Sequence, residues 1–306
     1  MSLTREIDAS KVYVEKDLSY DEENDFLGCG GFAEVFRARL TKSPVVDRLV
    51  AFKRIYKRRR NAEQTKDLEK EAGILLSIPR HPHIVELVGV CDSPRCYGLL
   101  VEFVEGKDLE SCLDSSYEDC AAFRKWNNRL RMSRQIADGM AHLHAQTPAV
   151  IHQDLKPQNV LIRRQEGLYI CKICDFGLSK MRGISTITSE RRGGERPAGT
   201  VVYIAPERYS PQLLPEGKKL EYAKKSDVYS FGVILWEIRE LKHPYQDELP
   251  TVVHEIVKSR QTLPPPQAKS PENYDDLQAR CSIPDADQRP SFTEIQTELG
   301  LITAED

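Results

Sequence analysis

Two stretches near the middle of the chain decide the fold: VIHQDLKPQNVLI, residues 150–162, and KICDFG, residues 172–177. In the first, apolar strand-like residues flank a polar loop that runs from Asp154 to Asn159. The polar side chains of this loop are therefore expected to converge on one place. The second stretch adds the carboxylate of Asp175 shortly afterwards. These two segments are the centre of the candidate functional site.

A glycine cluster precedes this centre, in the sequence GCGGFAEV at residues 28–35. Glycine lets the main chain approach phosphate oxygens closely, and its exposed amides can bind an anion. The cluster has no Gly-Lys-Ser/Thr ending, and a strand pattern follows it instead of a helix, so it is neither a Walker A loop nor a dinucleotide fingerprint. Alone it is equally compatible with an ordinary hairpin turn.

A lysine in a strand pattern follows, in Val50-Ala51-Phe52-Lys53. Strand side chains repeat every second residue, so Ala51 and Lys53 share a face. We interpret Ala51 as facing the core and expect Lys53 to point into a cleft. Glu71, in the helix expected at 63–78, is the best candidate for its carboxylate partner. Glu63 and Glu69 are rivals.

The chain changes character after Gly106. Residues 1–25 are polar and form an expected leader that is either flexible or caps a strand. Strand patterns dominate 26–103, and the later segment is mainly helical. We therefore expect an α+β protein with an N-terminal β-rich lobe at 26–101, a connection at 102–106 and a larger helical lobe at 107–306. The main helices are expected at 126–144, 226–239, 251–258 and 291–299.

Composition excludes several function classes. The 306 residues carry 44 Lys and Arg against 47 Asp and Glu, which gives a net charge of −3 and no basic signature of nucleic-acid binding. No stretch approaches the roughly 20 apolar residues of a membrane span. The N-terminus has no apolar signal region, and eight cysteines are too few for a disulfide framework. We expect a cytoplasmic protein with reduced thiols.

The motifs, taken in order, resemble those of a eukaryotic protein kinase domain. They are GCGGFAEV, VAFK, HQDLKPQN, DFG, GTVVYIAPE, SDVYSFGVILWE and a late Arg289-Pro290, and they cover about residues 26–299. The resemblance implies the bilobal kinase fold, with a small antiparallel sheet and one main helix in the N-lobe and a larger helical C-lobe. The mixture of serine/threonine-like and tyrosine-like segments is typical of the tyrosine-kinase-like group, within which receptor-interacting or mixed-lineage relatives are favoured.

The resemblance also implies catalytic roles. Asp154 matches the catalytic base, Lys156 the residue that stabilises the transferring phosphoryl group, and Thr200 a bridge between these two. Lys53 matches the contact to the α- and β-phosphates, with Glu71 as its partner. Asn159 and Asp175 match the Mg²⁺ ligands, and hard oxygen ligands with substrate phosphates suit this ion.

The implied cofactors are ATP and Mg²⁺. Val101 matches the gatekeeper position, and the main chains of Glu102 and Val104 are expected to hydrogen-bond adenine. Val35, Ala51 and Leu161 would sandwich the base. The full set expected around ATP is Leu27, Gly28, Gly30, Gly31, Phe32, Val35, Ala51, Lys53, Val101, Glu102, Val104, Leu161 and Cys174.

Other matched positions have structural interpretations. We expect His152 to pack under Phe176 instead of acting as a base. Asp227, at the start of an apolar segment, is expected to cap a helix and, by the resemblance, to tie down the catalytic loop. Glu207 and Arg289 match a buried salt bridge, which specifies geometry more than it adds stability.

Gln153 departs from the kinase pattern. It replaces the usual arginine before Asp154, and a neutral amide cannot pair with a phosphate on the activation loop. This non-RD form weakens the case for activation by loop phosphorylation without excluding it. The activation segment is expected at 175–207, and we place its regulatory phosphorylation between Ser185 and Ser189.

The substrate class follows from Lys156-Pro157-Gln158, which resembles the serine/threonine form of the loop. The sequence therefore predicts Mg²⁺-dependent transfer of the ATP γ-phosphate to Ser/Thr of protein substrates, including itself. A nucleotide-binding pseudokinase or scaffold is the alternative, and a dual-specificity kinase is a smaller rival. A kinase-domain homodimer and adaptor proteins are further possible partners. The chain is expected to be one domain of a longer signalling protein.

Overall fold

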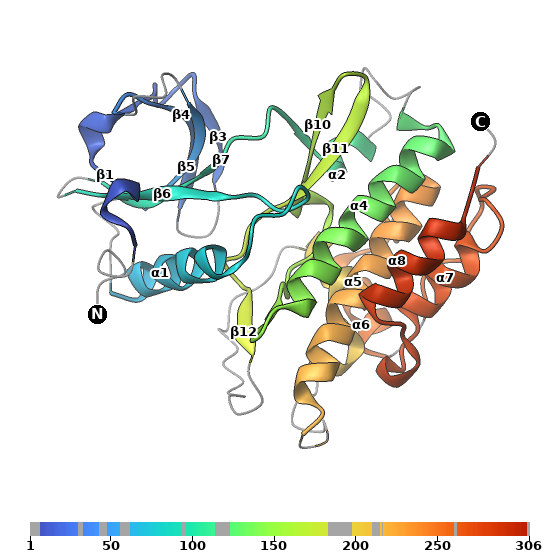
Figure 1. Cartoon of the computed structure of the whole chain (residues 1–306). Helices are drawn as coiled ribbons and strands as arrows, with labels where there is room; N and C mark the ends of the chain where they lie inside the picture. Colours follow the sequence, from blue (N-terminus) through green and yellow to red (C-terminus); the bar gives the residue numbers. More distant parts are fainter. Residues whose placement is uncertain are drawn as a thin grey trace. The chain divides into compact units, whose positions relative to one another are not determined.

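The computed structural model of the chain divides into two compact units, Met1–Glu105 and Gly106–Asp306. It describes residues 7–29, 33–42, 48–55, 62–93, 96–113, 123–182, 198–209, 215, 217–259 and 262–304, with the main chain alone at 62, 63, 180–182, 198–200, 250 and 257. The first unit is built on a β-sheet and the second mainly on helices (Figure 1), which confirms the expected α+β kinase fold.

The sheet of the first unit runs in the order β1-β6-β7-β5-β4-β2, with β3 paired to β4. All pairs are antiparallel except β1 with β6, a short parallel ladder that the sequence did not predict. The strands are β1 Val12–Tyr13, β2 Leu18–Ser19, β3 Phe26–Cys29, β4 Glu34–Leu40, β5 Leu49–Ile55, β6 Leu87–Asp92 and β7 Tyr97–Glu102.

One core cluster of the first unit lies on one face of this sheet. Alternate residues of β5, Val50 and Phe52, are fully buried there together with Leu100 of β7. Leu18 of β2 joins the same cluster, so part of the expected leader belongs to the fold. Helix α1, Ala62–Ser77, packs against β6 and β7.

The second unit is assembled around two long helices. Their length and apolar stripes, typical of buried helices, agree with the sequence pattern. Figure 1 shows α4, α5 and α8 side by side, as their contacts require. The helices are α2 Leu109–Leu113, α4 Trp126–Ala145, α5 Lys219–Glu240, α6 Pro250–Lys258, α7 Tyr274–Ser282 and α8 Phe292–Leu301.

Two small sheets complete the second unit and carry its polar loops. One has the order β11-β10-β8 and the other pairs β12 with β9. The strands are β8 Gly106–Asp108, β9 Ala149–Ile151, β10 Val160–Gln165, β11 Leu168–Ile173 and β12 Lys180–Arg182. The loop from Gln153 to Asn159 therefore lies between β9 and β10, as the flanking apolar residues predicted.

Candidate functional site

An ion pair between Lys53 and Glu71 links β5 to α1. The ammonium nitrogen lies 2.9 Å from Glu71 Oε1 and 2.8 Å from Oε2. The Glu71 side chain is only 5% exposed, which limits screening of the pair by solvent. Of the three carboxylates that the sequence offered, Glu69 instead receives the Tyr97 hydroxyl at 3.4 Å, and the side chain of Glu63 lies outside the described residues.

The strand register gathers other expected nucleotide residues on the face of Lys53. Val35 on β4 lies opposite Lys53, and Ala51 lies opposite Val101 on β7. Residues opposite one another or two apart share a face, so Val35, Ala51, Lys53 and Val101 do so. Ala51 itself is partly buried, and its face also carries the buried Leu99, which lies opposite Lys53.

The glycine cluster begins at the end of the β3–β4 hairpin. Gly28 and Cys29 pair with Val35 and Glu34, and the register shifts between Phe26 and Gly28. Leu27 is half exposed on β3. The expected phosphate-contacting residues Gly30, Gly31 and Phe32 lie outside the described residues.

The connecting segment after β7 has its main chain partly occupied. The amide of Glu102 donates to the carbonyl of Glu86 at 2.8 Å, so this amide is not available to a ligand. Val104 is buried, and within the described part of the chain its main chain makes no hydrogen bond. Of the two main-chain amides expected to contact adenine, only that of Val104 is therefore still available as a hydrogen-bond donor among the described residues.

The catalytic-loop residues come together in the second unit. Lys156 Nζ lies 2.9 Å from Asp154 Oδ2. The Asn159 amide nitrogen donates to that same oxygen at 3.1 Å and to the Asp154 carbonyl at 2.7 Å. These bonds use the nitrogen of Asn159 and leave its Oδ1 as the atom suited to a cation. The sequence prediction that the three side chains converge is confirmed.

Asp175 is positioned by a strained main chain. Its φ is +60°, a conformation that non-glycine residues rarely adopt and that is enriched at active sites. Gly177 donates its amide to Asp175 Oδ1 at 3.3 Å. The residues on either side of Asp175 both contact His152. The Phe176 ring lies 5.2 Å from the His152 ring, and the Cys174 carbonyl accepts a hydrogen bond from His152 Nε2 at 3.1 Å. The expected packing of His152 under Phe176 is confirmed.

Asp227 holds the catalytic loop through a fully buried carboxylate. It accepts the amide of His152 at 2.8 Å, the amide of Gln153 at 2.8 Å and His144 Nε2 at 2.9 Å. Burial opposes its ionisation, but the hydrogen bond and charge of His144 and the other donors lower the pKa of Asp227 below its usual value. The expected cap was wrong, because α5 begins at Lys219 and Asp227 lies in its interior.

Gln153 has its main chain fixed at both ends. Its φ is +67°, and its carbonyl receives Arg208 Nη1 at 2.7 Å. Sequence analysis missed Arg208 and His144 as supports of this loop. Both contacts span more than fifty residues, and no local pattern marks either residue.

A buried polar network lies behind the segment that follows Thr200. The Tyr203 hydroxyl donates to Glu237 Oε1 at 2.8 Å, and His243 Nδ1 lies 2.7 Å from the same oxygen. The side chain of Thr200 and the residues 183–197, where we placed regulatory phosphorylation, are outside the description. Nearby, Arg289 binds Glu207 through two nitrogens at 2.7 and 2.9 Å, which confirms the expected buried salt bridge.

The donor set fits one Mg²⁺ ion bound together with phosphates. This ion is held by one or two carboxylates, other oxygens and substrate phosphates, not by a cage of protein ligands. The Asp175 carboxylate and the Asn159 Oδ1 provide such oxygens. Accordingly, the described residues contain no cluster of three or more His, Cys, Asp and Glu arranged for a metal.

The comparison with known families decides the assignment. Residues 22–299 match the family described as protein tyrosine and serine/threonine kinase. This chain belongs to that family. It is a protein kinase domain whose Gln153 marks the non-RD form.

Its relatives carry serine/threonine-kinase names. It is 34% identical over 183 residues to receptor-interacting serine/threonine-protein kinase 2 of Bos taurus, covering 59% of this chain and 32% of that protein. It is 31% identical over 278 residues to receptor-interacting serine/threonine-protein kinase 4 of Mus musculus, covering 89% and 32%. Probable serine/threonine-protein kinase drkD of Dictyostelium discoideum is 32% identical over 270 residues, covering 88% and 19%.

These relatives are consistent with a kinase domain of the tyrosine-kinase-like group. The chain spans a third or less of the length of each of these three relatives. Among the helices that the structure describes, none is long and apolar enough to cross a membrane.

Proposed function

We propose that the protein transfers the γ-phosphate of ATP to serine and threonine hydroxyl groups of protein substrates. The observation that carries this proposal is the cluster of Asp154, Lys156 and Asn159, joined by contacts of 2.7–3.1 Å and anchored through Asp227. Phosphoryl transfer depends on positioning and charge neutralisation, which a preorganised cluster of this kind provides.

Each member of the cluster has a role that suits its chemistry. Asp154 orients the substrate hydroxyl and accepts its proton as the oxygen attacks phosphorus. Lys156 neutralises charge on the transferring phosphoryl group, and Thr200 bridges these two residues. Lys53, oriented by Glu71, binds the α- and β-phosphates. Preorganised charges act more strongly in a site from which water is excluded.

Asn159 and Asp175 would hold the magnesium ion, which supplies charge neutralisation at the phosphate oxygens. Their own contribution is orientation. The Asn159 nitrogen donates to Asp154, and the Asp175 carboxylate accepts the amide of Gly177. The residues on either side of Asp175, Cys174 and Phe176, both contact His152.

The adenine end of ATP would be recognised mainly by the first unit. The main chain between Glu102 and Val104 provides hydrogen bonds, and apolar side chains cover the base. Val35 and Ala51 share the face of Lys53, which supports this placement. The other proposed contacts are Leu27, Gly28, Gly30, Gly31, Phe32, Val101, Leu161 and Cys174.

Serine and threonine specificity is supported by the Lys156-Pro157-Gln158 form of the loop and by the names of the relatives. We also propose that the protein acts in the cytoplasm, where ATP is available. A second kinase domain or an adaptor is a candidate partner besides the substrates.

The test is Mg²⁺-dependent transfer of labelled phosphate from ATP to the chain itself and to a generic protein substrate. Asp154→Asn removes the proposed base, and Asp276→Asn, at an aspartate that is 71% exposed on α7, is the matched control. We expect label on serine and threonine in the native chain and in the control, and none in Asp154→Asn.

Two outcomes would contradict the proposal. Absence of transfer in the native chain, with ATP still bound, would favour the pseudokinase alternative. Transfer that survives in Asp154→Asn would show that another group accepts the proton. Label on tyrosine as well as serine would indicate dual specificity.

A further inference from the structure

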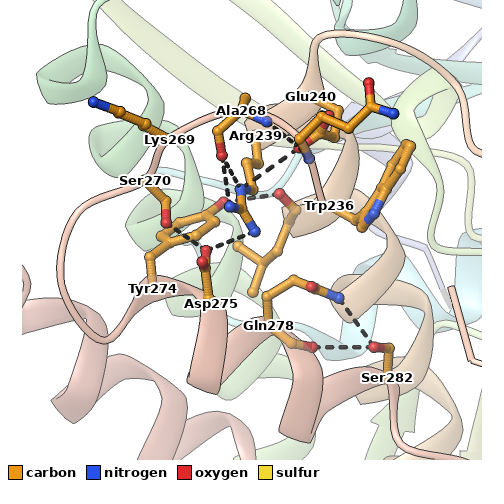
Figure 2. Close-up of polar contacts among 12 residues, drawn as sticks. Trp236, Arg239, Glu240, Ala268, Lys269, Ser270, Tyr274, Asp275, Gln278 and Ser282 are labelled. Atoms are coloured by element: carbon orange, nitrogen blue, oxygen red, sulfur yellow. Dashed lines mark hydrogen bonds and ion pairs between the residues drawn. The ribbon is translucent and has the colours of Figure 1, made fainter. Parts of the chain in front are cut away.

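A strap without helix or strand, Thr262–Asn273, connects α6 to α7 in the second unit. Side chains of α4 and α5 bind its carbonyl oxygens, and Figure 2 shows Arg239 of α5 at the carbonyl of Ala268. These contacts are Trp236 Nε1 to Pro264 O at 2.9 Å, Arg239 Nε to Ala268 O at 2.8 Å and Trp126 Nε1 to Lys269 O at 3.2 Å. The strap is therefore held largely through its main-chain carbonyl groups.

Ser270 lies in this strap, between the exposed Lys269 and Pro271. A residue before proline is restricted to an extended main chain, which is a form that an enzyme can bind. The Ser270 hydroxyl is half-buried and donates to Asp275 Oδ1. Figure 2 shows the Ser270 hydroxyl directed toward Asp275, whose carboxylate lies against Arg239.

Arg239 is the cation behind this pair, and its side chain is only 6% exposed. Its Nε and Nη2 are used by the Ala268 carbonyl. Nη1 lies 2.8 Å from Asp275 Oδ1, yet within the described residues this buried atom makes no well-directed hydrogen bond. Asp275 is 50% exposed, so its carboxylate can turn outward and leave Nη1 to a better-placed anion.

The start of α7 adds a second favourable feature. Its N-cap residue, Asn273, makes no side-chain hydrogen bond to the first turn, and the N-terminal end of a helix favours negative charge. The carboxylates of Asp275 and Glu240 already lie beside Arg239 and limit how much further negative charge can be accommodated there. Glu240 accepts the amides of Gln267 and Ala268 at 3.0 Å and stays in place, so a new anion must replace Asp275 instead of joining it.

We propose that Ser270 is a phosphorylation site for a proline-directed protein kinase and that its phosphate takes the place of Asp275 beside Arg239. In this step the Ser270 oxygen bonds to the γ-phosphorus of ATP, the bond from that phosphorus to the β-bridging oxygen breaks, and ADP leaves. The hydroxyl proton passes to the catalytic carboxylate of the modifying kinase. The phosphate brings three acceptor oxygens and nearly two charges to Nη1 of a guanidinium, where only one oxygen of Asp275 now lies.

The first experiment locates the modification. The whole chain carrying Asp154→Asn, which prevents its own transfer, is incubated with a proline-directed kinase and ATP and then mapped by peptide mass. Phosphate is expected at Ser270. It should disappear in Ser270→Ala and persist in Ser93→Ala, a matched serine that also precedes a proline. Phosphate confined to other Ser-Pro dipeptides, or absent from the chain while a control peptide is modified, overturns the proposal.

The second experiment locates the phosphate. A free phosphoserine titrates near pH 6, and pairing with a guanidinium shifts this midpoint downward. The ³¹P resonance should titrate below about pH 6 in the folded protein and return to about 6 in urea. Asp275→Ala, which vacates the position beside Arg239, should lower the folded midpoint further. Equal midpoints in the folded and unfolded chain, or no response to Asp275→Ala, overturn the placement.

Discussion

The main-chain amide of Gln153 donates to Asp227 Oδ1 at 2.8 Å, and this bond holds a residue whose φ is +67°. Arg208 fixes the carbonyl of the same residue at 2.7 Å. The loop that presents Asp154 is thus positioned through its main chain. This arrangement does not depend on the Gln153 side chain, which is consistent with glutamine at a position where kinases usually carry arginine.

Asp227→Asn should weaken both the fold and catalysis. The amides of His152 and Gln153 bind different oxygens of Asp227, and the substitution replaces one of these oxygens by a nitrogen that cannot accept a hydrogen bond. Hydrogen bonds to charged groups contribute about 1.5–3 kcal/mol, so we expect the free energy of unfolding to fall by about 3 kcal/mol. Urea denaturation and kcat are the measurements. Asp276→Asn should change stability by less than about 0.5 kcal/mol, and equal losses in both variants would contradict the assignment.

The same carboxylate predicts a dependence on acid pH. The folded-state pKa of Asp227 is lowered, because the His144 and main-chain donors outweigh the effect of burial. Its ionised form therefore stabilises the protein above an unfolded pKa of about 3.9, and this contribution is lost as the pH falls through the lower folded value. Below about pH 4, the unfolding free energy of the native chain should decrease more steeply than that of Asp227→Asn. Parallel curves would contradict this.

Glu71→Gln tests the ion pair of the first unit. The amide keeps the shape of the side chain but cannot hold Lys53 by charge. Loss of a direct electrostatic contact costs about 10²–10³ in rate, and we expect a smaller loss, on the order of 10–100-fold in kcat/KM, because Lys53 itself remains. Glu69→Gln, on the same helix, is the control and should retain most of the activity. A similar loss in both variants would mean that α1 matters without this specific pair.

The sequence predicted the parts of the site that depend on local pattern. Asp154, Lys156 and Asn159 lie within one short loop between two apolar strands, so their convergence follows from chain length alone. The partnership of Lys53 with Glu71 joined a strand to the next helix.

The contacts that the sequence did not reveal connect distant segments. Helix α7 is short and polar at its start, and its fixed position depends on Arg239 of α5 and on the strap. Glu237 lies within a strongly apolar stretch of the sequence. No neighbouring residue indicated that its carboxylate would be buried and would bind the Tyr203 hydroxyl and the His243 ring. Such networks are determined by tertiary packing, which a single-sequence pattern does not encode.

The Glu237 network should shift the titration of His243. Burial opposes protonation of this imidazole, but the hydrogen bond and charge of Glu237 raise the pKa of His243 above 6.5 overall. A raised folded pKa stabilises the protein fully below the unfolded value, and the contribution is lost as the pH rises through the folded value. NMR titration should give a midpoint above 6.5 in the native chain. Glu237→Gln leaves burial, which lowers the pKa, and the charge of Glu110, which raises it, and should therefore lower the midpoint relative to the native chain. An unchanged midpoint would assign the shift to other groups.

Gly106 starts β8 at a position where no side chain fits. A Cβ atom there would lie 1.9 Å from the carbonyl oxygen of Ile162 on β10, so Gly106→Ala must displace one strand from the other. Overpacking of this kind costs about 1–3 kcal/mol, and the same ladder carries Leu161, a proposed adenine contact. We expect lower stability by about 2 kcal/mol and a raised KM for ATP. The control is Gly300→Ala on α8, where a Cβ atom meets nothing within 4 Å; it should stabilise the protein by about 0.5–1 kcal/mol. A Gly106→Ala variant with native stability and native KM would contradict the prediction and show that β8 can shift freely.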